Sequence, residues 1–214
     1  DGRSIGVLFQ FSSLSFCIGF CWIAFANVPS VARSLFPSLT DEVLAWTLNA
    51  NNCAQVLSTP YAIWLLRRPI RVIGRPRTGL RPSMRLAALA QALQSGLWGA
   101  AALMPDEARS SSHVLVMIMI GACLGGVACA LTQGLITRLS ATWFSPSARG
   151  LATSLALASQ YAGFAASYCA SLLVCTESTL RIQLIAQAVV AVALLVVVLA
   201  LFPEAPQGSS GSGS

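Results

Sequence analysis

The chain has 214 residues, of which 56% are hydrophobic and only 9% are charged, and its formal net charge is +6. Soluble domains carry roughly 25% charged residues. This composition therefore excludes an ordinary soluble enzyme or binding domain and favours a membrane protein.

Six runs along the chain are long and apolar enough to cross a bilayer, which takes about 20 residues of helix. Lipid offers no hydrogen-bond partners to the backbone, so each run is expected to be an α-helix. The sequence thus predicts an all-α, polytopic membrane protein with one six-helix bundle over residues 1–204. The expected spans are Ile5 to Ala26, Leu44 to Leu66, Leu86 to Met104, Val114 to Ile136, Gly150 to Val174 and Ile182 to Phe202.

The last ten residues, 205–214, are read as a flexible Gly/Ser tail of the kind added to recombinant proteins. Together with a start at Asp1 rather than at a methionine, this tail favours a piece cut from a longer protein.

The basic residues, all of them arginine, predict the orientation of the bundle. If successive helices alternate in direction, ten of the thirteen arginines share one side, which the positive-inside rule makes cytoplasmic, with both termini. The stretch "RRPIRVIGRPRTGLRPSMR" is read as a cytoplasmic loop beside anionic headgroups, kept from forming a helix by its prolines, rather than as a nucleic-acid site. The ten are Arg3, Arg67, Arg68, Arg71, Arg75, Arg77, Arg81, Arg85, Arg138 and Arg149.

The seven cysteines do not predict a metal site or a cofactor. Six of them lie within the expected spans, where a thiol is a small packing group, and the single histidine, His113, belongs to a loop. No phosphate-binding loop and no convergent catalytic set is present, so an enzyme is not expected.

Polar side chains inside the spans are the candidate functional residues, because polar groups in lipid usually face other helices or a water-filled path. Asn52, Gln55 and Thr59 follow the spacing i, i+3, i+7, as do Gln160, Gly163, Phe164 and Ser167, so both faces are expected to point inward. Either they form hydrogen bonds between helices or they line a shared polar cavity. The candidate cavity residues are Trp22, Asn27, Asn52, Gln55, Gln133, Gln160, Tyr161 and Phe164, whereas Gly121 and Gly125 are read as packing residues.

Three segments resemble one family of major facilitator transporters, the feline leukaemia virus subgroup C receptor family. The segment "GLITRLSATWFSPSARGLATSLALASQYAG" is similar to its helix four to five region, "FCWIAFANV" to its first helix, and "IWLLRRP" with "TGLRPSMRLAALAQAL" to its second and third helices. The resemblance covers nearly all of residues 5 to 202. Arg67 departs from it, since an acidic residue is usual there, and Cys129 stands where the family has a glutamine.

The resemblance implies one half of a transporter, a three-plus-three inverted repeat that needs a second six-helix half beside it in the bilayer. It implies a small organic solute as partner, with choline, ethanolamine or haem as cargo, Trp22 at the pocket, and Arg67, Arg138 and Arg149 in the cytoplasmic gating region. An indole binds quaternary ammonium groups without a formal charge, which favours an organic cation. Because the acidic residues lie near helix ends or in loops, facilitated transport is expected. Two alternatives stay open: a carrier of haem, sugars or organic anions, and a non-transporting receptor or scaffold.

Overall fold

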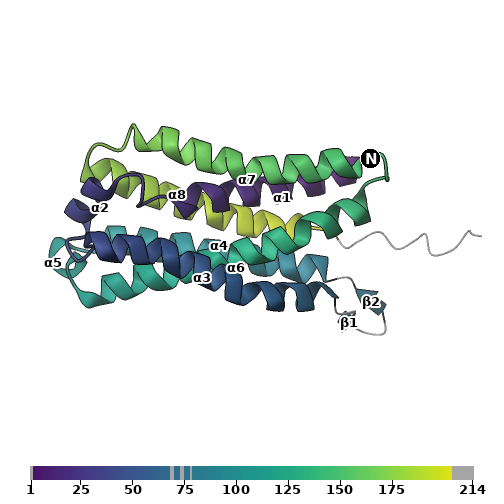
Figure 1. Ribbon diagram of the computed structural model, residues 1–214, viewed down its shortest axis with the longest axis horizontal. Helices are drawn as coiled ribbons and strands as arrows, with labels where there is room; N and C mark the ends of the chain where they lie inside the picture. Colours follow the sequence, from purple (N-terminus) through teal and green to yellow (C-terminus); the bar gives the residue numbers. More distant parts are fainter. Residues whose placement is uncertain (1, 68–69, 73–74, 78, 204–214) are drawn as a thin grey trace, which may run out of the picture.

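The computed structural model describes residues 2–67, 70–72, 75–77 and 79–203, and within these ranges the chain forms a bundle of six long helices (Figure 1). Two short helices and a small antiparallel hairpin join them, with Ile70 paired to Arg77. In chain order the elements are α1 (Gly2–Trp22), α2 (Pro29–Leu35), α3 (Asp41–Arg67), β1 (Ile70–Val72), β2 (Arg75–Arg77), α4 (Leu80–Leu103), α5 (Asp106–Arg109), α6 (Ser112–Trp143), α7 (Arg149–Ser171) and α8 (Glu177–Leu201).

Each of the six predicted runs coincides with one long helix, but several boundaries were wrong. The first helix ends at Trp22 rather than Ala26, and a turn leads into the separate helix α2 at Pro29. Helix α4 begins at Leu80, six residues before the expected start, and so contains Pro82. A proline in the first helical turn costs nothing, because the amide of that position has no partner within the helix anyway. The tail at 205–214, and Arg68 and Pro69 of the basic stretch, lie outside the described residues.

Among the described residues, four helices are long and apolar enough to cross a membrane by themselves: α1, α4, α6 and α8. The chain is therefore a membrane protein, but the finding supports four spans where six were expected. Helices α3 and α7 fall short because polar side chains, including the asparagines of α3 and Gln160 of α7, dilute their apolar surface.

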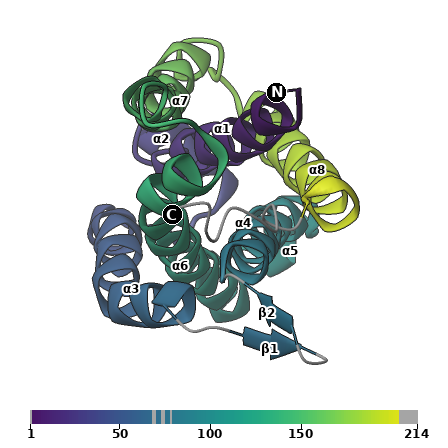
Figure 2. The same cartoon turned by 90° about the vertical axis from the view of Figure 1, so that its right-hand side faces the viewer.

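The long helices pack as two groups of three that lie side by side. Helices α7, α1 and α8 form one group, and α3, α6 and α4 the other, with α8 packed along α4 and α1 touching α6 (Figure 2). The start of α1, the hairpin and the α6–α7 connection share one end of the bundle, while α2 and α5 occupy the opposite end (Figure 1).

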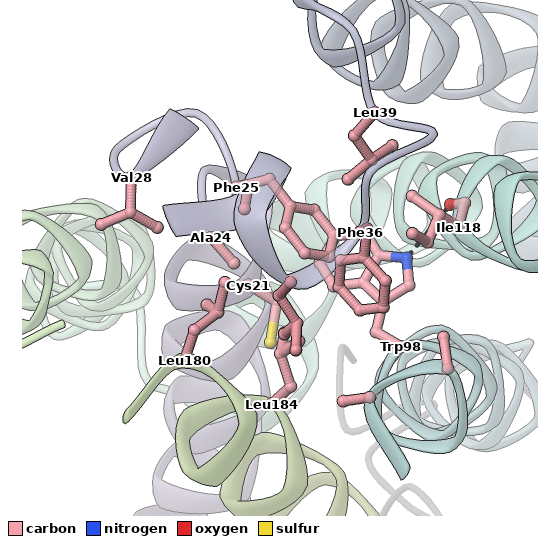
Figure 3. Close-up of a cluster of buried hydrophobic side chains, with 14 of the residues drawn as sticks. Cys21, Ala24, Phe25, Val28, Phe36, Leu39, Trp98, Ile118, Leu180 and Leu184 are labelled. Carbon is pink, nitrogen blue, oxygen red and sulfur yellow. Dashed lines mark hydrogen bonds between the residues drawn. The ribbon is translucent and has the colours of Figure 1, made fainter. Parts of the chain in front are cut away.

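An aromatic cluster closes the core at the end that holds α2 and α5. The Phe25 ring lies 4.7 Å from the ring of Trp98 and 6.1 Å, edge-on, from that of Phe36 (Figure 3). The Trp98 indole N–H donates to the Ile118 carbonyl at 3.1 Å, so this buried ring keeps its hydrogen bond. These contacts hold the segment between α1 and α3, residues 23–40, against α4 and α6.

Glycines bring two helix pairs into backbone contact. A Cβ added at Gly19 of α1 would overlap the Gln160 carbonyl oxygen of α7, and one at Gly126 of α6 would overlap the Asn51 carbonyl oxygen of α3. Gly121 and Gly125 are confirmed as packing residues, since they leave room for the side chains of Trp98 and Gln94.

Candidate functional site

Three of the predicted residues form an aromatic group where the end of α1 meets α7. The ring of Phe164 lies 6.3 Å, edge-on, from that of Trp22 and 6.1 Å from that of Tyr161. Trp22 and Phe164 are half-buried, whereas Tyr161 is 68% exposed. The close α1–α7 contacts at Gly19 and Gly163 bring these rings together, because they set the register of the two helices. Three rings therefore border a partly open surface.

Asn27 continues this group toward the α2 end. It lies in the turn after α1, and its Nδ2 donates to the Ser167 hydroxyl of α7 over 3.4 Å. Ser167 is buried, as the spacing on that helix predicted. The polar turn is thus joined to the helix that carries Tyr161 and Phe164.

A second group of predicted residues lies on the α3–α6 pair. Gln55 donates from Nε2 to the Oε1 atom of Gln133 over 2.9 Å, a bond between the two helices. Asn52 and Thr59 are exposed, so they do not pack against another helix of this chain, and their place at a shared cavity stays a prediction. Helix α3 instead packs through a stripe shifted by one residue, namely Leu44, Thr47, Asn51, Ala62 and Leu66.

Gln160 links the two groups. Its side chain is buried, as predicted, and its Nε2 donates to the Cys129 sulfur of α6 over 3.2 Å. Cys129 is the residue that stands where the resembled family has a glutamine, so a thiol here accepts the bond from α7.

Of the eight predicted residues, Trp22 alone lines the small cavity that lies beside it. This cavity has about 10 Å³ available to the centre of a water-sized group. Its walls are Trp22, Phe25, Ala26, Thr47, Leu48, Asn51, Trp98 and Ala122. A larger hollow of about 730 Å³ lies between α1, α7 and α8, and its walls are almost wholly apolar, as suits contact with lipid chains.

Asn51 is the residue of this cavity that the sequence analysis missed. It is 2% exposed, and among the described residues its Oδ1 atom has no hydrogen-bond partner. The signal that could have found it is the spacing of Leu44, Thr47 and Asn51, which is also i, i+3, i+7.

The three arginines named for the cytoplasmic region have separate positions. Arg149 donates from Nε to the Phe144 carbonyl at 3.3 Å and from Nη2 to the Ala141 carbonyl at 3.2 Å. It thereby satisfies carbonyls at the end of α6 that have no partner within the helix. Arg67 is exposed as the last residue of α3, and Arg138 is half-buried in α6.

A comparison of the sequence with models of protein families finds no match, and a comparison with curated proteins finds none either. The family resemblance therefore stays a prediction.

Proposed function

We propose that the chain is one six-helix half of a major facilitator transporter, similar to the feline leukaemia virus subgroup C receptor family, and carries a small organic cation such as choline or ethanolamine. The observation that carries the proposal is the aromatic group of Trp22, Tyr161 and Phe164 on the α1–α7 pair.

The proposal requires all six long helices to cross the membrane, including α3 and α7. Helix α3 has 27 residues and α7 has 23, which makes them about 40 Å and about 35 Å long, more than the roughly 30 Å hydrocarbon core. Each packs along a helix that is apolar enough to span by itself, α3 on α6 and α7 on α1. Polar groups on such helices are tolerated where they face a water-filled path.

The packing supports an inverted three-plus-three repeat. In such a repeat α1 corresponds to α6, α3 to α7 and α4 to α8. The α1–α7 pair then corresponds to the α6–α3 pair, and the α4–α8 contact corresponds to itself. The two pairs also share a close glycine contact, because Gly19 of α1 lies against the Gln160 carbonyl of α7 as Gly126 of α6 lies against the Asn51 carbonyl of α3.

The proposed orientation places both termini in the cytoplasm. In the bundle, Arg3, Arg67, Arg81 and Arg149 lie at the helix ends that share one side with the hairpin. The positive-inside rule assigns that side to the cytoplasm.

The chemistry of the site favours a cation over a sugar or an anion. A quaternary ammonium within about 6 Å of an aromatic ring gains about 0.5–2 kcal/mol from each contact, and three rings border the same surface. All eight predicted residues are uncharged, so the site would neutralise no bound anion. Movement of the cation would follow its own gradient, and the second six-helix half would supply the opposite wall.

Binding of choline to the purified chain in nanodiscs tests the proposal. Choline and ethanolamine should raise the unfolding temperature, while glucose should leave it unchanged. Trp22→Ala should remove the choline effect because it removes one of the three rings, the one that the resemblance places at the pocket, whereas Trp46→Ala, at an exposed tryptophan of α3, should keep it. Equal responses of the two variants would contradict the assignment of Trp22. No response to any organic cation would favour a scaffold. In vesicles that hold both halves, choline uptake should not depend on a pH gradient.

A further inference from the structure

Asn51 is a buried amide whose acceptor atom lacks a hydrogen-bond partner. Its side chain is 2% exposed, and no described residue donates to Oδ1. The position of the residue is fixed, because the Asn51 carbonyl oxygen lies directly against Gly126 of α6. A buried acceptor left without a donor is costly, so a site that presents one calls for a donor from elsewhere.

Two other polar groups on the wall of the small cavity, those of Thr47 and Trp98, already have partners for their hydrogens. The Thr47 hydroxyl donates to the Leu44 carbonyl at 2.5 Å, and the Trp98 indole donates to the Ile118 carbonyl at 3.1 Å. Both residues line the cavity together with Asn51. The cavity therefore presents acceptors, Asn51 Oδ1 and the Thr47 oxygen, to whatever enters it.

Size and position limit what can enter. The cavity has about 10 Å³ for the centre of a water-sized group, which is room for about one hydroxyl. Trp22 belongs both to the cavity wall and to the aromatic group beside it. A ligand whose cationic end lies against the aromatic group can thus place a terminal hydroxyl in the cavity, if only a short linker separates the two.

We infer that Asn51 is a specificity residue that accepts a hydrogen bond from the terminal hydroxyl of a short amino-alcohol cation. This inference rests on the proposed function, because it takes the aromatic group as the site of the cationic end. The cavity selects amino alcohols over tetraalkylammonium ions, which lack a donor.

Asn49 provides the matched control for Asn51. It is the same residue type two positions earlier on the same helix, but its side chain is exposed and it is absent from the wall of the cavity. A substitution there changes the composition of α3 equally and leaves the acceptor in the cavity untouched.

The experiment measures binding of choline and propyltrimethylammonium to the full chain in nanodiscs by isothermal titration. Propyltrimethylammonium replaces the hydroxyl of choline by a methyl group of similar size. The wild type should bind choline about tenfold more tightly than propyltrimethylammonium, as expected for the loss of one buried hydrogen bond. Asn51→Leu should abolish this preference by weakening the binding of choline alone, and Asn49→Leu should keep it.

The outcomes separate this inference from the proposed function. If the wild type binds both ammonium ions equally, or if Asn51→Leu keeps the tenfold preference, the role of Asn51 is refuted while the cation site stands. If no ammonium ion binds, the proposed function fails and the inference fails with it. Thermal unfolding checks the variant, because replacing an unpaired buried amide should leave the apoprotein at least as stable as the wild type. Should Asn51→Leu fail to fold, the wild-type ratio alone decides.

Discussion

Replacing Gly126 by alanine should destabilise the bundle, although alanine is the better helix former. The new Cβ would overlap the Asn51 carbonyl oxygen and would lie 2.8 Å from the backbone nitrogen of Gln55 and 2.9 Å from the Ala54 Cβ. Two of these atoms belong to the backbone of α3 and cannot rotate away, so the two helices must separate. Overpacking of this kind costs about 1–3 kcal/mol. Alanine recovers up to about 1 kcal/mol of helix propensity, which leaves a net loss of up to about 2 kcal/mol.

Gly96 in the middle of α4 is the matched control. A Cβ added there meets nothing within 4 Å, so Gly96→Ala should keep only the gain in helix propensity and stabilise the chain by about 0.5–1 kcal/mol. The free energy of unfolding, measured by titration of dodecylmaltoside micelles with SDS, should therefore change with opposite sign in the two variants. A Gly126→Ala chain as stable as Gly96→Ala would refute the close α3–α6 contact.

Three further predictions concern the end of the bundle that holds α2 and α5, the Gln55–Gln133 hydrogen bond between α3 and α6, and the orientation of the chain in the membrane. Arg109→Met should lower the unfolding free energy by about 1–2 kcal/mol, because Arg109 is only 5% exposed and interacts with Asp106, Glu177 and the Leu35 carbonyl. Arg33→Met should cost less than about 1 kcal/mol, since both partners of the Arg33–Asp41 pair are exposed. Thermal unfolding measures both losses, and an equal loss in Arg109→Met and Arg33→Met would contradict the expected difference. Gln55→Leu removes the bond to Gln133 and should cost about 0.6 kcal/mol, the average for such bonds between membrane helices, in SDS titration; a loss above about 2 kcal/mol would refute an isolated bond. Cys175, exposed in the α7–α8 connection, should react with an impermeant maleimide on intact cells, whereas Ser147→Cys in a Cys175→Ser background should react only after permeabilisation; the reverse pattern would overturn the proposed orientation.

The helices could be predicted from the sequence because a run of apolar residues that must satisfy its backbone in lipid has few other solutions. Their ends were harder to predict. The turn after Trp22 and the short helices α2 and α5 depend on contacts such as that of Phe25 with Trp98, which join residues 73 positions apart. The start of α4 was predicted too late because Pro82 was expected to prevent a helix, whereas a proline within the first helical turn is tolerated.

The candidate site was predictable on α7 and less so on α3. Gln160 and Ser167 lie on the buried face that their spacing indicates. On α3, consecutive asparagines offered two registers with the same spacing, and the choice between Asn51 and Asn52 depends on where Gly126 of α6 touches the helix. That contact joins distant parts of the chain, and helical periodicity within α3 carries no information about it.

Helix α6 has 32 residues and is about 48 Å long if straight, well beyond the roughly 30 Å of a hydrocarbon core. Its C-terminal turns would stand in the headgroup layer or in the water beyond it, with the carbonyls at their end held by Arg149. A rigid rod of this kind moves at both ends when it tilts, so a small displacement beside Gly126 would swing the Trp143 end through a larger arc. In the proposed orientation, the α6–α7 connection would thus move on the cytoplasmic side in response to a change in the middle of the bilayer.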